Sequence, residues 1–329
     1  MAPYYDGLGA FLFRQLFWTI PEPPPDRLDG QRILVTGANA GIGYSLTLML
    51  ARRGAEVVMA VRSVARGEEA RNEICREVPE ARICVRHCDL ADFLSVNTFL
   101  EELKSERSQF DLVILNAGVW CAERQDSVDG HDMTLQTEKV NVLANALLAS
   151  SLQHLLRSTL GNPSRMVFVT SEGHAMVPSD FAQDEKLLAR FAIQPYSTSF
   201  DHYQHYYLSK LFGLLWALAF ARRVDPEKVS IVLASPGLCH SNLFRDVRSV
   251  PSNFLAWCFA RPSSDGARIL LTAALACPQR ASIYPGDTYF SQGRVVPVSR
   301  FASAPAGIVW QDKLWDEVAQ LLEPFKNNI

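Results

Sequence analysis

The sequence predicts an α/β protein with a doubly wound parallel sheet in a single domain. Short apolar segments that read as strands alternate with longer segments that read as helices from residue 31 onward. Several of the strands are apolar on both faces, which is typical of a parallel sheet covered by helices on both sides. The first strand also runs directly into a glycine-rich turn that opens a helix. Right-handed crossovers between such strands give the doubly wound arrangement.

The expected strands and helices follow one another regularly along the chain. Strands are expected over 31–36, 55–61, 81–87, 110–115, 165–170 and 229–234. Helices are expected over 42–53, 64–77, 94–106, 129–158, 203–223 and 310–322. Gly54 ends the first of these helices. The last helix places Trp310, Leu314, Val318 and Leu321 on one face, as packing on a core requires. We expect residues 30–329 to form one domain.

Residues 1–29 are expected to form an extension, with an apolar helix over 8–20 and a proline-rich linker after it. The helix is too short to cross a bilayer, which takes about 20 apolar residues. Two interpretations stay open. The helix packs on the surface of the domain, or it acts as a peripheral anchor that dips Phe13, Phe17 and Trp18 into a membrane interface.

Composition and charge exclude several classes of protein. Hydrophobic residues make up 48% of the chain and charged residues 20%, which supports a full core and excludes disorder. The net charge of −3 comes without a long basic block, so nucleic acid is not an expected partner. The seven cysteines form no Cys-x-x-Cys pair and the seven histidines show no ligand spacing. We therefore expect no metal, reduced thiols and a cytoplasmic location, with peripheral contact to an intracellular membrane as the alternative.

The glycine-rich turn between the first strand and the first helix holds Gly37, Gly41 and Gly43. Such a turn lets a nucleotide pyrophosphate approach bare backbone, and the helix N-terminus supplies N–H donors and a partial positive charge. Because any tight turn between strand and helix favours glycine, the turn indicates a nucleotide site only together with a second motif.

That second motif is Tyr206-x-x-x-Lys210, which opens the helix expected over 203–223. A spacing of four puts the phenol and the ammonium on the same helix face. A nearby positive charge lowers the pKa of a phenol from its reference value near 10. The lowered pKa would make Tyr206 a usable proton donor and acceptor near neutral pH.

Together with further motifs in the same order, these two give the chain a resemblance to the short-chain dehydrogenase/reductase family. The motifs are Thr36-Gly-x-x-x-Gly-Ile-Gly43, Asp89-Leu90, Asn116-Ala-Gly118, Val140-Asn141, Val169-Thr-Ser171, Tyr206-x-x-x-Lys210 and Pro236-Gly237. The likeness covers roughly residues 30–298. Within the family, the chain is most similar to the retinol-dehydrogenase-like branch and to the oxidoreductase part of the WW-domain-containing oxidoreductase. The resemblance implies a Rossmann fold and a nicotinamide cofactor.

The resemblance also implies a role for each catalytic residue. Ser171 matches the serine that holds the substrate carbonyl oxygen, and Tyr206 matches the general acid for reduction. Lys210 matches the residue that lowers the pKa of the tyrosine and binds the nicotinamide ribose. Asn141 matches the asparagine that holds a water for proton relay; a helix bend or a satisfied core amide is the alternative reading of this residue.

The cofactor contacts are assigned by the same resemblance. The phosphate turn is expected to use Gly37, Asn39, Gly41, Ile42 and Gly43. The adenosine end is expected to contact Asp89, Leu90, Asn116, Ala117 and Gly118. The nicotinamide end is expected to contact Tyr206, Lys210, Pro236, Gly237, Cys239 and Ser241, where Ser241 stands in place of the family's usual threonine.

The choice between NAD(H) and NADP(H) is expected at the end of the second strand. An acidic residue there would bond the ribose 2′-OH and repel a 2′-phosphate. This chain has Val61 followed by Arg62, and a guanidinium can pair with a phosphate through charge-assisted hydrogen bonds. The sequence therefore predicts NADP(H).

The substrate is expected to be a small apolar carbonyl or alcohol. The segments 172–205 and 251–260 leave the sheet at its ligand-binding edge and are rich in aromatic residues, although both could simply cover the core. A retinoid, steroid or other lipid fits, as does a polyketide- or terpenoid-type intermediate of secondary metabolite biosynthesis. His174, Asp201, His202 and His205 flank the first segment and could supply a further acid or only pack it. A homodimer is expected from the family, and a catalytically silent nucleotide-bound scaffold is the alternative function.

Overall fold

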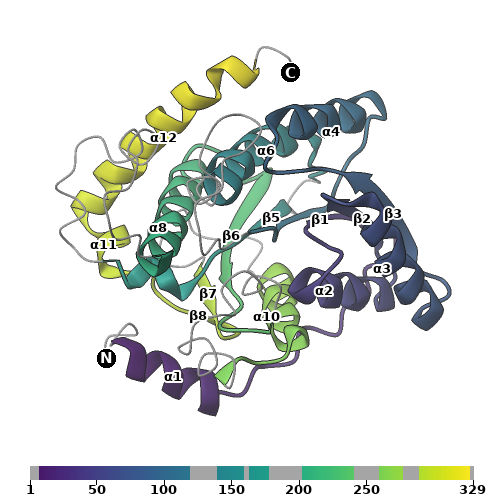
Figure 1. Ribbon diagram of the computed structural model, residues 1–329, viewed down its shortest axis with the longest axis horizontal. Helices are drawn as coiled ribbons and strands as arrows, with labels where there is room; N and C mark the ends of the chain where they lie inside the picture. The colour runs from purple at the N-terminus through teal and green to yellow at the C-terminus, as the bar shows by residue number, and fades with distance from the viewer. Residues whose placement is uncertain are drawn as a thin grey trace.

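An eight-stranded sheet with helices on both faces forms the centre of the structure (Figure 1). The computed structural model describes residues 7–118, 139–158, 163–177, 202–240, 259–276 and 289–326. The strand order is β3-β2-β1-β4-β5-β6-β7-β8. All neighbours pair in parallel except β7 and β8. The predicted fold class, a doubly wound parallel sheet of the Rossmann type, is confirmed.

The six predicted strands lie within two residues of the predicted ranges; five of them are buried on both faces, and β3 at the edge of the sheet is half-buried. They are β1 (Arg32–Thr36), β2 (Glu56–Val61), β3 (Arg82–His87), β4 (Leu112–Leu115), β5 (Ser164–Val169) and β6 (Val229–Ser235). Two further strands, β7 (Tyr289–Ser291) and β8 (Arg294–Val295), extend the sheet beyond the prediction.

The helices on one face of the sheet are α2 (Gly41–Arg52), α3 (Val64–Glu77) and α10 (Ser263–Ala276). The opposite face is covered by α4 (Phe93–Ser105), α6 (Asn145–Leu152), α8 (His202–Ala221) and α12 (Pro305–Lys326). Shorter pieces are the π-helix η1 (Lys139–Ala144), the 3-10 turns η2 (Gln153–Leu155) and η3 (Glu172–Ala175), and α11 (Arg300–Ser303). Successive strand residues alternate between the faces: Ile33 and Val35 pack toward α2, whereas Leu34 packs toward α4.

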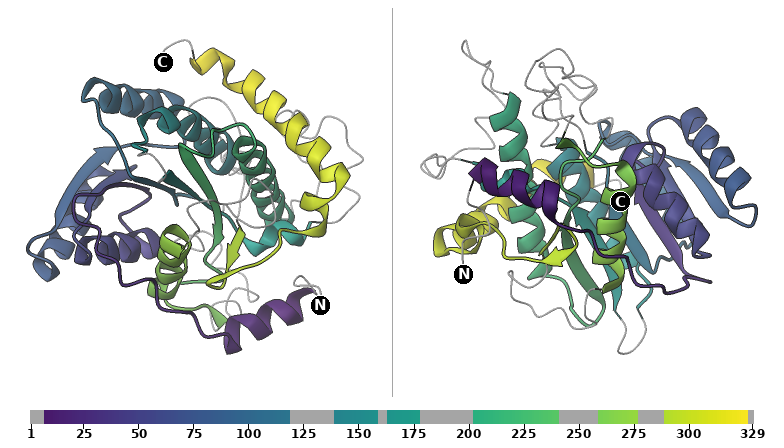
Figure 2. Two further views of the ribbon diagram at one scale, coloured as in Figure 1. Left: turned by 180° about the vertical axis from the view of Figure 1, so that it is seen from behind. Right: turned by 90° about the horizontal axis from the view of Figure 1, so that it is seen from below.

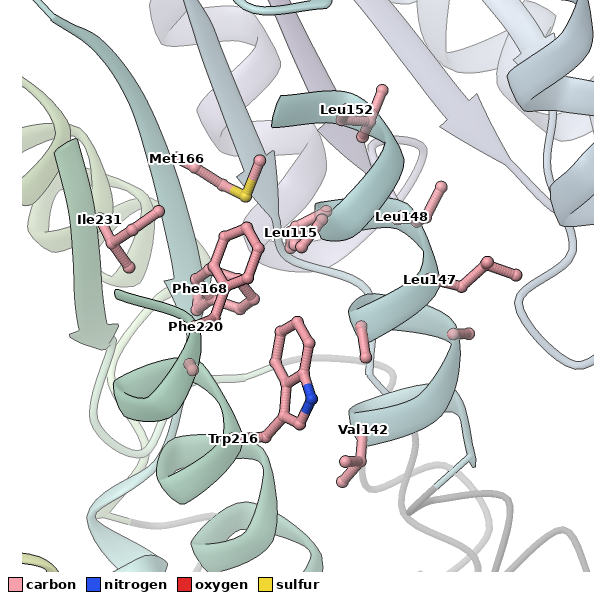
Figure 3. Packing of buried hydrophobic residues seen from close by; sticks show 14 of the residues in the cluster. Leu115, Val142, Leu147, Leu148, Leu152, Met166, Phe168, Trp216, Phe220 and Ile231 are labelled. Atoms are coloured by element: carbon pink, nitrogen blue, oxygen red, sulfur yellow. The ribbon is translucent and has the colours of Figure 1, made fainter. Parts of the chain in front are cut away.

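The helix α8, which carries Tyr206 and Lys210, is fixed by aromatic packing. Trp216 and Phe220 lie against Phe168 of β5, with Leu147 and Leu148 of α6 nearby (Figure 3). Trp315 of α12 stacks on Trp216 with 5.6 Å between the ring centroids. The helix α12 of the same chain therefore covers the side of α8 that carries Trp216.

Two predicted helices differ from the structure. The described part of the helix expected over 129–158 is a π-helix, then α6, and it ends in η2 at Leu155. It ends there because Phe110 donates its N–H to the Leu155 carbonyl and accepts the N–H of Arg157. The helix expected over 310–322 runs from Pro305 to Lys326. It buries Leu322, while Leu321 is 41% exposed.

The N-terminal helix α1 (Gly7–Phe17) lies beyond the layered body, beside β7 and β8, and the linker then passes α10 to reach β1 (Figures 1 and 2). Its exposed face consists of Phe13, Leu16 and Phe17, which are 58%, 51% and 68% exposed. Trp18 is not part of this face, because it lies against the guanidinium of Arg294, 4.4 Å from the ring centroid. Within the described residues, no helix combines the length and the apolarity that crossing a membrane requires.

Candidate active site

The glycine turn at the end of β1 has the geometry of a phosphate cradle. Gly37 and Gly41 have φ values of 64° and 52°, which only glycine adopts readily. A Cβ on Gly43 would lie 2.2 Å from the Gly37 carbonyl oxygen, so this position admits no side chain. The N-cap of α2 is Ala40, whose side chain makes no capping hydrogen bond. The backbone N–H groups of the first turn therefore point outward without a side-chain acceptor at the cap, which suits an anion.

Asn116 and Ala117 tie this turn to the end of β4. The Asn116 amide donates to the Thr36 carbonyl at 2.9 Å, and the Ala117 N–H donates to the Thr36 hydroxyl at 2.9 Å. Order in the sheet reverses between β1 and β4, and nucleotides bind at such a reversal. The Asn116 side chain thus holds the two edges of the crevice together.

The remaining residues predicted for the adenosine end surround the same edge. Asp89 follows β3, and its carboxylate accepts the Ala91 N–H at 3.0 Å, while Leu90 beside it is buried. Arg62 is exposed directly after β2. The next residue, Ser63, caps α3 by accepting the Arg66 N–H. Arg62 is therefore exposed at the carboxyl end of β2, next to the N-terminus of α3.

The four predicted catalytic residues come together from three elements. Ser171 follows β5, and its hydroxyl is hydrogen-bonded to the Tyr206 phenol on α8. Asn141 lies in the π-helix η1, a rare form of helix that is frequently found at functional sites. A Cβ built on Gly118 would lie 3.0 Å from Asn141 Oδ1 and 3.3 Å from Lys210 Nζ. The asparagine and the lysine therefore converge just beyond the end of β4.

One residue of this group was not singled out from the sequence. Ser209 is fully buried on α8 and accepts a hydrogen bond from the Asn141 amide at 3.3 Å. Its own hydroxyl donates to the Tyr206 carbonyl at 2.8 Å. Ser209 thus fixes the orientation of Asn141 relative to the start of α8.

The pKa of Tyr206 differs from the sequence-based expectation. Burial raises the pKa of Tyr206 to about 12, and the hydrogen bond with Ser171 lowers it by less. Burial also lowers the pKa of Lys210 to about 8. The expectation of a lowered phenol pKa is wrong for this structure, because desolvation of the phenol outweighs any charge nearby. The phenol is therefore protonated near neutral pH.

His174, three residues after Ser171, has a structural position. It is 1% exposed, and burial lowers the pKa of its imidazole to about 4. Its Nε2 accepts the Ser299 N–H at 3.2 Å. The proton of the neutral ring must then sit on Nδ1, which lies 2.7 Å from the Ser171 carbonyl and donates to it. His174 thus holds the backbone of Ser171 against the segment that precedes α11.

The loop after β6 leaves the sheet beside Ser171, because β5 and β6 are neighbouring parallel strands with Val169 paired to Ala234. Gly237 has φ 75°, and Cys239 is 3% exposed with its thiol donating to the Pro236 carbonyl. Burial raises the pKa of Cys239 to about 12, so its thiol stays protonated. Ser241 lies outside the described residues, as do Asp201 and most of the segments 172–205 and 251–260.

A set of buried polar residues beside this loop also escaped the sequence analysis. Arg14 and Gln15 of α1 contact Glu172, Leu238, Arg261 and Gln292. A signal was present, because Arg14 and Gln15 interrupt an otherwise apolar segment. Their partners lie at least 158 residues away along the chain, so the sequence alone did not show what they bind.

Comparison with known proteins places the chain in a family. A model of the short chain dehydrogenase family matches residues 31–181. A short chain dehydrogenase of Aspergillus nomiae is 31% identical over 335 residues, which cover 96% of this chain and 88% of that protein. One of Alternaria solani is 35% identical over 274 residues, 82% of this chain and 93% of that protein. The chain belongs to the short-chain dehydrogenase/reductase family.

Solved structures agree with this membership. A protein from Mycobacterium paratuberculosis superposes with a TM-score of 0.65 at 28% identity, covering 90% of this chain and 94% of that one. A short chain dehydrogenase from Burkholderia cenocepacia, solved in complex with NADP, shares the fold with a TM-score of 0.57 at 21% identity, covering 81% and 97%. As a short-chain dehydrogenase/reductase, the chain is an oxidoreductase of a family that uses a nicotinamide cofactor. The narrower likeness to the retinol-dehydrogenase-like branch stays a prediction.

Proposed function

We propose that the protein is an NADP(H)-dependent enzyme that interconverts a carbonyl and an alcohol on an apolar small molecule. The observation that carries the proposal is the convergence of Ser171, Tyr206, Lys210 and Asn141 beyond the phosphate turn. A protein that only binds a nucleotide has no need for a phenol hydrogen-bonded to a serine beside a buried lysine. This arrangement favours the enzyme over the silent scaffold.

Each of the four residues has its own role in proton transfer to and from the substrate. The bound nicotinamide supplies or accepts the hydride. Ser171 donates a hydrogen bond to the substrate oxygen, and Tyr206 gives its proton to that oxygen during reduction. Lys210 has a pKa of about 8 and is largely protonated at neutral pH, so its ammonium stabilises the negative charge that Tyr206 acquires. Asn141 holds a water through which Tyr206 regains the proton that it gives to the substrate. The protonated phenol of the structure is the form that reduction requires.

Arg62 supports NADP(H) as the cofactor. Its exposed guanidinium directly after β2 can pair with a 2′-phosphate. Neither Val61 nor Arg62 has a carboxylate, which a ribose 2′-OH would require as its partner. We infer that Gly37, Asn39, Gly41, Ile42 and Gly43 receive the pyrophosphate. The segment Pro236–Ser241 would then hold the nicotinamide.

The composition of two segments near the site supports the proposed substrate class. The segments 172–205 and 251–260 carry Phe181, Tyr196, Phe254 and Trp257, which suits a large apolar carbonyl. A polyketide- or terpenoid-type intermediate fits relatives from Aspergillus and Alternaria, and a retinoid or steroid fits the same chemistry. We place the protein in the cytoplasm, with α1 able to touch a membrane surface.

The decisive experiment is NADPH oxidation with a panel of apolar ketones and aldehydes, comparing the wild type with Tyr206→Phe. The variant is expected to lose about 10²- to 10⁴-fold in kcat, the usual contribution of a positioned general acid, while its cofactor affinity is kept. Val309→Ser, an exposed change on α12, serves as the control. Tight NADPH binding without turnover of any carbonyl would favour the scaffold instead.

A further inference from the structure

The helix α1 carries two polar side chains that are buried although the helix lies at the surface. Arg14 is 6% exposed and Gln15 is 3% exposed, whereas Phe13 and Leu16 on either side are more than half exposed. Burying a guanidinium and an amide costs free energy unless each is hydrogen-bonded. The partners that satisfy them belong to the two sides of the candidate active site.

Arg14 reaches the side of the site that holds the substrate oxygen. Its Nη2 donates to Glu172 Oε2 at 2.7 Å, and both side chains are buried. The other oxygen of Glu172 accepts from the Ser291 hydroxyl at 2.5 Å and from the Gln292 amide at 3.2 Å. A carboxylate held by three donors has little freedom, and Glu172 directly follows Ser171. Arg14 therefore restrains the backbone that carries the Ser171 hydroxyl.

Gln15 reaches the opposite side, the loop after β6. Its Nε2 donates to the Leu238 carbonyl at 2.6 Å, and its Oε1 accepts the Leu238 N–H at 3.3 Å. The side-chain amide thus pairs with both backbone groups of one residue, as a neighbouring strand would. Space here is tight, because a Cβ on Gly237 would lie 3.0 Å from Gln15 Oε1. Gln15 fixes the position of Leu238 next to Cys239.

Arg261 locks α1 onto this loop. Its guanidinium donates to the carbonyls of Arg14, Gln15 and Trp18, at 2.9, 2.9 and 3.0 Å, which satisfies acceptors at the end of the helix. Its backbone N–H donates to the Leu238 carbonyl, and its carbonyl accepts the His240 N–H. Gln292 joins the two sides, because its amide contacts both Glu172 and Gln15.

We propose that Arg14 and Gln15 are positioning residues for hydride transfer, and that they set the geometry of Ser171 relative to the loop at Leu238. This inference rests on the proposed function, in which Ser171 holds the substrate oxygen and the loop holds the nicotinamide. Neither residue touches substrate or cofactor. Hydride transfer is sensitive to small displacements, since a misplacement of about 1 Å can cost about 100-fold in rate.

The test compares the full-length wild type with Gln15→Leu, which keeps the volume and removes the amide. We expect kcat to fall by about 10- to 100-fold, KM for NADPH to rise and the primary isotope effect with deuterated NADPH to grow. Gln15→Glu keeps an acceptor for the Leu238 N–H but places its second oxygen against the Leu238 carbonyl, so it is expected to recover none of kcat. Arg27→Met is the control, because Arg27 lies in the same extension but pairs with Asp29 at the surface. A wild-type kcat and KM in folded Gln15→Leu would overturn the proposal.

Arg14 requires a double variant, because Arg14→Met alone leaves the Glu172 carboxylate buried without its cation. Arg14→Met combined with Glu172→Gln removes both charges together. We expect the double variant to fold and to have a lowered kcat. A lowered melting temperature with unchanged kcat and KM would show that the two residues have a purely structural role, and would contradict the proposal.

Hydrogen exchange of the backbone amides separates this inference from the proposed function. The amides of Leu238 and His240 are expected to exchange faster in Gln15→Leu than in the wild type, whether or not a carbonyl substrate is found. Unchanged exchange would refute the positioning role on its own. Faster exchange with no turnover of any carbonyl by the wild type would leave the contact established but remove its link to hydride transfer, which also counts against the proposal.

Discussion

Arg62 is the residue at which the proposed cofactor choice can be tested most directly. Its side chain is exposed directly after β2. Arg62→Asp replaces a guanidinium that can pair with the 2′-phosphate of NADPH by a carboxylate that can bind the 2′-OH of NADH. Because a hydrogen bond to a charged group contributes about 1.5–3 kcal/mol, we expect KM for NADPH to rise about 10- to 100-fold while KM for NADH falls. Steady-state kinetics with both cofactors measures the change.

Arg76→Asp is the matched control, since it makes the same charge change at the other end of α3, where the side chain is exposed. If Arg62→Asp and Arg76→Asp altered the NADPH Michaelis constant equally, the effect would be one of overall charge and the assignment to the 2′-phosphate would fail.

The buried imidazole of His174 makes the free energy of unfolding depend on pH. Its folded pKa of about 4 lies below its ordinary value of 6.5, so the unfolded chain takes up a proton that the folded protein rejects. The free energy of unfolding is therefore unaffected by His174 above pH 6.5. It falls by up to about 3 kcal/mol as the pH drops toward 4.

The measurement is chemical denaturation of the wild type and of His174→Gln between pH 4 and 7. Glutamine can still donate and accept but does not titrate here. The difference in the free energy of unfolding between the two proteins is expected to shrink as the pH falls, because only the wild type loses the stability that its neutral imidazole contributes. A pH-independent difference would mean that His174 does not stay neutral in the folded protein.

At the same scale, the identities of the catalytic side chains were predictable and their environments were not. Tyr206 and Lys210 are visible at a spacing of four. The desolvation that raises the pKa of Tyr206 depends on elements that the sequence does not join, and so do the partners of Glu172 and His174.

At the scale of elements, the glycine turn makes a steric prediction. Gly43→Ala would place a Cβ 2.2 Å from the Gly37 carbonyl, so the turn or α2 has to move. We expect a loss of about 1–3 kcal/mol in stability, the usual cost of overpacking, and a large loss of NADPH affinity. Calorimetric titration with NADPH and a denaturation curve measure both quantities.

Gly9→Ala is the control for that experiment. Gly9 lies in α1 with no atom within 4 Å of a built Cβ, so alanine there is expected to be neutral or slightly stabilising. Unaltered NADPH binding in Gly43→Ala would show that the turn is not the phosphate site.

Most elements that the sequence predicted have a long apolar pattern, although α10, which also has one, was not predicted. The strands β1, β2, β4, β5 and β6 were found because they are buried on both faces, whereas β3 at the edge of the sheet is only partly buried. β7 and β8 have three and two residues, too few for any periodicity. The π-helix at Asn141 packs against α8, where a Cβ on Gly213 would lie 3.3 Å from the Asn141 carbonyl oxygen, and no local sequence pattern marks it.

At the scale of the whole molecule, the outer face of α1 is the surface suited to a membrane. Phe13, Leu16 and Phe17 are exposed together at helical spacing, and the rings of Phe13 and Phe17 are 5.1 Å apart. We expect weak, salt-insensitive association with neutral liposomes, because apolar burial rather than charge drives it. Changing all three residues to serine is expected to abolish flotation with liposomes.

The control is Ile308→Ser with Val309→Ser, which removes an exposed apolar pair from α12. Deleting α1 is a poorer test, because it would also remove the buried contacts of Arg14 and Gln15. Equal flotation of the triple variant and the wild type would rule out α1 as the contact.

The buried contacts of α1 also set the order in which the protein can be completed during synthesis. α1 precedes the other described elements along the chain, and its Gln15 contacts Gln292, which is made 277 residues later. Contacts between such distant parts of a chain form slowly. The phosphate turn and its strands can therefore assemble early, whereas the edge that carries Ser171 and Leu238 is finished only when α1 contacts Glu172, Leu238 and Gln292.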